Sequence, residues 1–159
     1  MKGNQKIIDA LNSLLTHELS AADQYFIHSQ MYEDMGLEAL YTRLEHEREE
    51  ELDHAKMLVE RILFLEGKPD VGSRAALNIG DDVPSMLKSD LDYELMVVDA
   101  LKDVIELCEK ERDYQTRQIL LKLLEDTEED HTYWLEKQLG LIEKVGLQNY
   151  MQSQMGSAG

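Results

Sequence analysis

Hydrophobic residues recur at spacings of three and four along most of this chain, which is the pattern of α-helices with one buried face. The helices are expected at about residues 5–35 and about 37–65, from about 82, from about 113 to 146, and at 147–155. The third of these would begin with Asp81 or Asp82 as its cap, followed by Pro84 in its first turn. The fold class is therefore predicted to be all-α, with four long helices and a short fifth.

Residues 66–83 separate the second and third helices and contain the helix breakers Gly67, Pro69, Gly72 and Gly80. A helix of about 28 residues is roughly 42 Å long. A link of roughly 18 extended residues reaches up to about 60 Å. The link can therefore return along a whole bundle, which predicts an antiparallel four-helix bundle with one long crossover and parallel second and third helices.

Each long helix carries a glutamate near the centre of its hydrophobic stripe. In the second and fourth helices a histidine follows three positions later, so both side chains are expected on one face. A lone glutamate precedes each Glu-x-x-His pair at a nearly equal distance. This order is typical of a two-metal carboxylate bundle. The six residues are Glu18, Glu51, His54, Glu94, Glu128 and His131.

The alternative is that these groups are solvated or salt-bridged in a chain with 33 acidic residues. For one glutamate that alternative would be favoured, but two matched Glu-x-x-His pairs favour a metal site. Unpaired buried charges cost several kcal/mol each, and two divalent cations would balance four carboxylates. Carboxylate and imidazole ligands without thiolate suit iron or manganese, with zinc as a competitor.

The formal net charge of −17 argues against a nucleic-acid partner, because phosphate contacts need clustered lysine and arginine. It favours cations. The single Cys108 fits a reducing compartment, no apolar run approaches the roughly 20 residues of a membrane helix, and no signal-peptide stretch opens the chain. We therefore expect a cytoplasmic protein with one domain over residues 1–155 and a flexible tail at 156–159.

Several segments of the chain resemble bacterioferritin: Met1–Gly3, Gln24–Ser29, Arg61–Gly67 and Leu147–Tyr150. The resemblance extends over nearly the whole chain. It implies a ferritin-like bundle that assembles as a hollow 24-subunit cage, oxidises Fe(II) with dioxygen or hydrogen peroxide at a di-iron centre, and stores a ferric mineral.

The resemblance also implies a role at the di-iron centre for each of the six residues. Two would be bridging carboxylates and four would be terminal ligands. Glu51 and Glu128 would bridge the two irons, Glu18 and His54 would complete one site, and Glu94 and His131 would complete the other.

Three further positions match residues of that family. Tyr25 matches a tyrosine near the centre that could donate a hydrogen bond or an electron, with a packed core tyrosine as the alternative. His46 and Glu50 match a pair on the cavity wall that binds an additional iron, with a solvated pair as the alternative. His28, in contrast, is expected at the surface or at a subunit contact.

In bacterioferritins a haem lies between two subunits, held by a methionine from each that directly follows the bridging glutamate. Here that position is Leu52, which has no ligand atom. A homopolymer of this chain is therefore expected to lack haem b at that position. A mixed cage with a haem-binding sister subunit is the alternative, and an iron-releasing ferredoxin is a further partner that the resemblance implies.

The expected function is that of a cytoplasmic ferroxidase and iron-storage subunit. A first rival is a di-metal bundle enzyme that does not store metal, such as a peroxidase or manganese catalase. A rubrerythrin is excluded, because it would carry a Cys-x-x-Cys module and this chain has one cysteine. A second rival is a structural subunit of a mixed cage, and a third is a non-catalytic helical protein with merely solvated acidic rows.

Overall fold

The computed structural model describes residues 1–156, and it contains no strand within them. The predicted four long helices and short fifth are confirmed, although the fourth is divided by a π-helical segment that periodicity did not predict. The tail was predicted at residues 156–159, and its residues 157–159 lie outside the described part. The elements are α1 (Gln5–Asp34), α2 (Glu38–Phe64), α3 (Val83–Lys110), α4 (Tyr114–Glu125), the π-helix η1 (Asp126–Thr132), α5 (Tyr133–Val145) and α6 (Leu147–Ser153).

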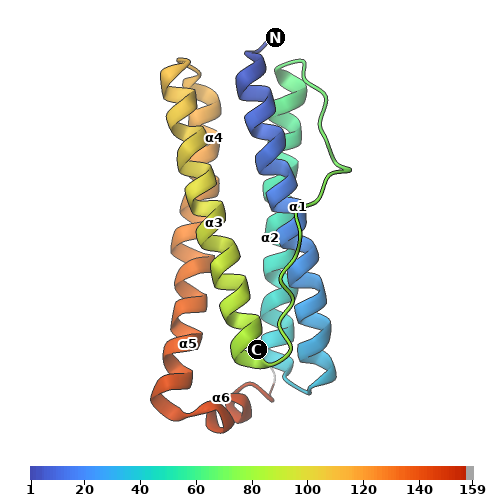
Figure 1. Cartoon of the computed structure of the whole chain (residues 1–159), viewed down its shortest axis with the longest axis vertical. Coiled ribbons are helices and arrows are strands. Elements are labelled where there is room, and N and C mark those ends of the chain that lie inside the picture. The colour runs from blue at the N-terminus through green and yellow to red at the C-terminus, as the bar shows by residue number, and fades with distance from the viewer. Residues whose placement is uncertain (157–159) are drawn as a thin grey trace.

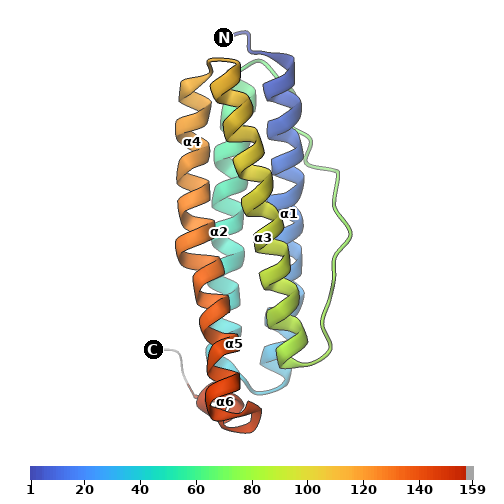
Figure 2. The same cartoon turned by 60° about the vertical axis from the view of Figure 1, so that its left-hand side comes forward.

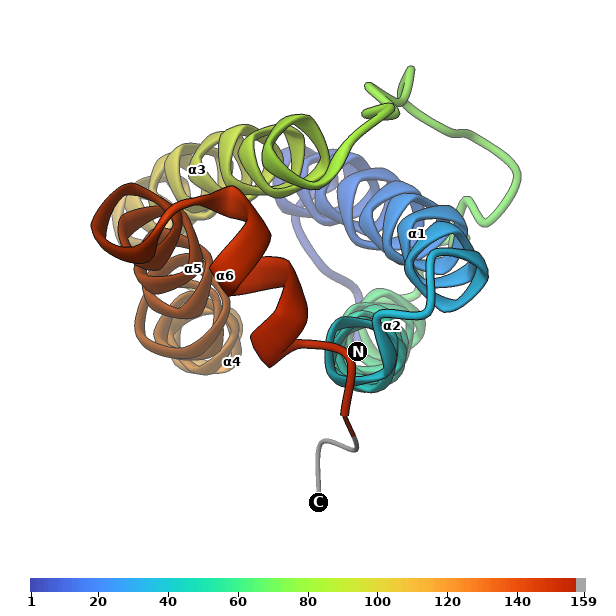
Figure 3. The same cartoon turned by 90° about the horizontal axis from the view of Figure 1, so that it is seen from below.

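The long helices form the predicted four-helix bundle (Figure 1). α1 and α2 run antiparallel, and the link after α2 returns along the outside of the bundle so that α3 runs parallel to α2 (Figures 1 and 2). α4, η1 and α5 form one continuous rod antiparallel to α3. α6 lies across one end of the bundle, as Figure 3 shows. Within residues 1–156, no helix is long and apolar enough to cross a bilayer.

Local sequence signals set the helix ends. Asn4 caps α1 by accepting from the Lys6 backbone N–H at 2.8 Å. Gly36 follows α1 with a φ of 79°, a left-handed conformation that glycine adopts without a Cβ clash. Asp82 caps α3 through a reciprocal capping box with Ser85, and Pro84 lies in the first turn of the helix. The predicted boundaries therefore rest on turn chemistry that acts over only a few residues.

The hydrophobic core has two parts separated by a polar layer. One part lies toward the start of α1 and includes Leu11 and Leu58, and the other lies toward α6 and includes Leu44 and Tyr150. Between them the bundle contains buried carboxylates and imidazoles. Because hydrophobic packing on both sides fixes the four rods, these polar side chains are held in place despite the cost of burying them.

The link is held against α1 by a row of polar side chains spaced four residues apart. These side chains accept hydrogen bonds from backbone N–H groups of the link. Ser20 accepts from Ala75 at 2.8 Å, Gln24 from Asn78 at 3.2 Å, and His28 from Gly80 at 3.1 Å. The expectation that His28 lies at the surface is wrong, because it is fully buried between Gly80 and Asp90. Its position depends on the path of the link, which helix periodicity does not encode.

Candidate metal centre

The polar layer brings side chains from all four rods of the bundle together. Each of the side chains that meet there is at most 3% exposed. They lie midway along their helices, where the hydrophobic stripe is interrupted. Five of the six predicted ligands are among them: Glu18 of α1, Glu51 and His54 of α2, Glu94 of α3, and His131 of η1.

These five residues form two groups that share Glu51. One group is completed by Glu18 and His54, the other by Glu94 and His131, and the donor atoms within each group lie within 4.8 Å of one another. Glu51 Oε1 is 2.9 Å from His131 Nδ1, and its Oε2 is 3.8 Å from His54 Nδ1. One carboxylate thus faces both imidazoles, which is the arrangement that a bridging ligand requires.

Several carboxylate and imidazole atoms of these five residues have no hydrogen-bond partner. Buried polar atoms in proteins are almost always paired, and an unpaired buried carboxylate is costly. Cations between the side chains would satisfy them, and oxygen and nitrogen donors without sulfur suit iron or manganese, with zinc as a competitor. The residues therefore fit divalent metal ions. The unpaired atoms are both carboxylate oxygens of Glu18, Glu51 Oε1, Glu94 Oε2, His54 Nδ1 and His131 Nδ1.

The pKa values of Glu18, His54 and His131 are all raised, by burial for the carboxyl and by neighbouring carboxylates for the imidazoles. Burial raises the pKa of Glu18 to about 8, and the neighbouring Glu51 adds to the rise. Burial alone would lower the pKa of His54, but the close carboxylates of Glu18 and Glu51 outweigh it and raise the pKa to about 11. The pKa of His131 likewise lies well above its usual value. Without metal the layer therefore retains protons, which metal binding must displace.

We expect the metal-free protein to lose stability as the pH rises from about 5 to about 9. Between pH 4.5 and about 8 the folded chain keeps a proton on Glu18 that the unfolded chain releases, and His54 does the same between pH 6.5 and about 11. The folded state then binds more protons, so the free energy of unfolding falls with pH. Chemical denaturation of the metal-free protein measures this slope.

The zinc-loaded protein is the control for this pH dependence. Protons compete with the metal for the same side chains, so its stability is expected to rise over the same pH range. A metal-free protein whose stability rises between pH 5 and 9 would contradict the assignment of retained protons to this layer.

Glu128, the sixth predicted ligand, does not join the cluster. Its side chain is 45% exposed, and its nearest cation is Lys102 Nζ at 3.8 Å. The prediction assumed an α-helix, in which residues three apart share a face. Glu128 and His131 lie in η1, whose i→i+5 hydrogen bonds widen the turn, so residues three apart diverge. The structure thus corrects the expected geometry of this pair, and the ligand role of Glu128 remains a prediction.

Tyr25 lies beside the cluster, as predicted from the resemblance. It is 3% exposed, and its hydroxyl donates to Glu94 Oε1 at 2.5 Å. Its ring contacts the His131 imidazole edge-on, with 6.5 Å between ring centroids. Burial and the negative charge of Glu94 raise the pKa of Tyr25 well above its usual value. The phenol therefore retains its proton and orients the Glu94 carboxylate, and a purely packing role does not describe it.

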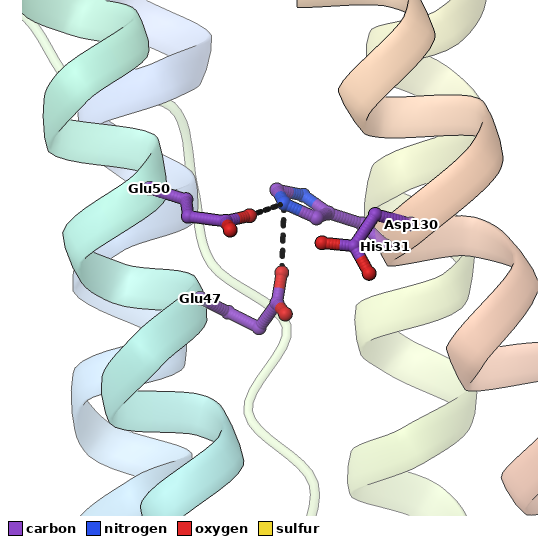
Figure 4. Close-up of side chains that lie close together, drawn as sticks. All are labelled: Glu47, Glu50, Asp130 and His131. Carbon is purple, nitrogen blue, oxygen red and sulfur yellow. Dashed lines mark hydrogen bonds and ion pairs between the residues drawn. The ribbon is translucent and has the colours of Figure 1, made fainter.

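A further group of carboxylates surrounds the other side of His131 (Figure 4). His131 Nε2 is 2.6 Å from Glu50 Oε2 and 2.8 Å from Glu47 Oε2. The predicted wall pair is also in contact, with His46 Nε2 at 2.8 Å from Glu50 Oε1. Glu50 therefore connects that pair to the buried cluster. Asp130 completes the group.

Sequence reasoning assigned no role to Glu47, Asp126 or Asp130. For Glu47 a signal existed, because it interrupts the same hydrophobic stripe as Glu51, and it is only 1% exposed. Asp126 lies five residues before His131, at the start of η1, and its Oδ2 is 3.0 Å from His54 Nε2. No α-helical spacing would have indicated that contact.

The profile of the family described as Ferritin, ferritin-like domain, matches residues 8–145. The chain belongs to the ferritin family. It is 59% identical over 155 residues to the bacterial ferritin of Synechocystis sp., with 98% of this chain and 99% of that protein covered. Against the bacterial ferritin of Paramagnetospirillum magnetotacticum the identity is 57%, with 98% and 96% covered. Against the bacterioferritin of Brucella melitensis it is 39%, with 96% and 94% covered. The resemblance drawn from sequence is thereby confirmed.

In this ferritin the position expected for a haem ligand lies outside the buried cluster. Leu52 directly follows Glu51 on α2 and is 42% exposed, so its side chain points away from the buried cluster. A methionine at this position would place its sulfur on the exposed surface of α2 rather than at the buried cluster. Leucine presents only hydrocarbon there.

Proposed function

We propose that this chain is a ferroxidase and iron-storage subunit that takes two Fe(II) ions as substrate in its polar layer and oxidises them to Fe(III). The observation that supports this most directly is the pair of buried triads that share Glu51 and leave several of their carboxylate and imidazole atoms without hydrogen-bond partners. An arrangement that leaves so many carboxylate and imidazole atoms unpaired is costly unless cations occupy it.

In the proposed reaction two Fe(II) ions lose one electron each, and dioxygen takes both electrons with two protons to give hydrogen peroxide. Hydrogen peroxide as oxidant would instead take two electrons and two protons to give two water molecules. Glu18 and Glu94 each supply one metal with negative charge, while Glu51 contacts both. Because Fe(III) carries the higher charge, this carboxylate-rich layer favours the product oxidation state. Tyr25 holds Glu94 in place by its hydrogen bond.

The wider proposal follows the family resemblance. Subunits assemble into a 24-subunit cage in the cytoplasm, and the inner wall presents His46 and Glu50 to iron on its way to the mineral. A cage made of this chain alone binds no haem at Leu52. A sister subunit with the methionine could supply that haem in a mixed cage, and a ferredoxin could supply electrons for iron release.

We expect rapid Fe(II) oxidation to saturate at two ions per subunit, followed by slower uptake as mineral forms. Stopped-flow absorbance measures both phases, sizing gives the assembly, and the visible spectrum of the same preparation reports any Soret band. Rapid oxidation by a dimer that stores no iron would instead support a non-storage di-metal enzyme. A cage that binds no iron would contradict the proposal altogether.

A further inference from the structure

Both histidines of the polar layer present the same nitrogen to the cluster and the opposite nitrogen to an outer carboxylate. His54 Nδ1 lies 3.4 Å from Glu18 Oε2, and its Nε2 lies 3.0 Å from Asp126 Oδ2. His131 Nδ1 lies near Glu51 and 3.5 Å from Glu94 Oε1, and its Nε2 lies 2.6 Å from Glu50 Oε2. The two imidazoles come from different helices, so the shared orientation does not follow from one local motif.

The outer carboxylates are themselves held by cationic or imidazole groups on their far side. Lys122 Nζ donates to Asp126 Oδ1 at 2.9 Å. Glu47, which lies beside Glu50 at His131, accepts from Arg43 Nε at 2.6 Å. Arg43 is fixed in turn, because it also donates to Asp130 at 2.9 Å and packs on the Trp134 ring at 4.7 Å. Each carboxylate is therefore oriented before any metal binds.

A neutral imidazole that binds a metal has one remaining N–H, and an ionised carboxylate can only accept a hydrogen bond. With a carboxylate at Nε2, the proton belongs on Nε2 and the Nδ1 lone pair faces the cluster. We infer that Asp126 positions His54, and that Glu50 with Glu47 beside it positions His131, so that both imidazoles meet the metal pair through Nδ1. This inference rests on the proposed function, since it concerns how the same centre is held.

An amide at residue 126 would reverse the direction of the hydrogen bond between this side chain and His54 Nε2. In Asp126→Asn, Lys122 would still require an oxygen acceptor, so the amide nitrogen would face His54 Nε2. The amide nitrogen can only donate, so His54 Nε2 would have to accept, and the imidazole proton would move to Nδ1, where the metal must bind. The substitution changes neither the size of the side chain nor the packing of the core.

The test is titration of the metal-free full-length protein with Co(II) alone, followed by calorimetry and by the visible ligand-field bands. The wild type is expected to bind two Co(II) ions per subunit. Asp126→Asn is expected to weaken one of the two by about 10–100-fold and to alter its bands, while the other ion binds as before. Asp126→Glu, which restores a carboxylate, is expected to recover most of the affinity.

Glu129→Gln is the matched control, because Glu129 is exposed in the same π-helical segment and its substitution removes the same charge. It should titrate as wild type. The double substitution of Glu47 and Glu50 by glutamine should weaken the other Co(II) ion instead. An Asp126→Asn protein that assembles normally and titrates like Glu129→Gln would overturn the inference. A wild type that binds no Co(II) pair would instead contradict the proposed function.

Discussion

Replacement of Glu51 by alanine is expected to abolish rapid Fe(II) oxidation while the helical bundle still folds. Glu51 is the one residue shared by both triads, and its two oxygens face different imidazoles. Loss of the hydrogen-bond partner behind a metal ligand typically lowers metal affinity or activity by about 10–100-fold. Loss of a ligand that both ions share should lower activity further. His54→Ala should have a similar effect, since it removes a ligand from one of two ions that must react together. Stopped-flow measurement of the initial rate gives the comparison.

Glu49→Ala is the control for this experiment. Glu49 lies on the exposed side of α2, and its substitution by alanine also removes one carboxylate from that helix. Its initial rate should match that of the wild type. Circular dichroism should show the same helix content in all of these variants, because hydrophobic packing on both sides of the layer holds the rods. Unchanged initial rates in both Glu51→Ala and His54→Ala would refute the assignment of the centre.

Glu18→Gln is expected to make the metal-free protein more stable and to remove most of its stabilisation by metal. Both oxygens of Glu18 are buried without hydrogen bonds, and its pKa of about 8 means that the carboxyl is ionised at pH 9. Burial and the neighbouring Glu51 raise this pKa, so the ionised carboxylate is destabilised in the folded state, and a neutral amide avoids that cost. Zn(II) at about 100–1,000 times its Kd should stabilise the wild type by about 2.7–4.1 kcal/mol, and the variant by much less.

Thermal denaturation at pH 9, with and without Zn(II), measures both effects. Asp9→Asn removes an exposed carboxylate from the same helix and should leave both melting temperatures near those of the wild type. A Glu18→Gln protein that melts lower than the wild type without metal would show that the carboxylate stabilises the fold by itself. The centre would then be a structural polar network rather than a site built for cations.

Much of this ferritin could be predicted from its sequence, because the deciding signals are local. The 3.6-residue hydrophobic period indicated the helices, and Asp81 or Asp82 with Pro84 indicated where α3 begins. The extended length of the link is enough to span a whole helix, which predicted that α3 runs parallel to α2. Five of six predicted ligands meet in the polar layer, because a hydrophobic stripe that carries a carboxylate must bring it inside when the stripe packs.

The remaining features depend on contacts between segments far apart in the chain. Glu128 lies outside the cluster and Asp126 inside it because η1 departs from the α-helical period, and no propensity in that stretch signals the departure. The carboxylates behind His131 and the burial of His28 beside the link also depend on neighbouring elements. The sequence by itself determined which residues enter the core. Only the tertiary structure decided which nitrogen or oxygen each presents to its neighbours, because that orientation is set by side chains from other helices.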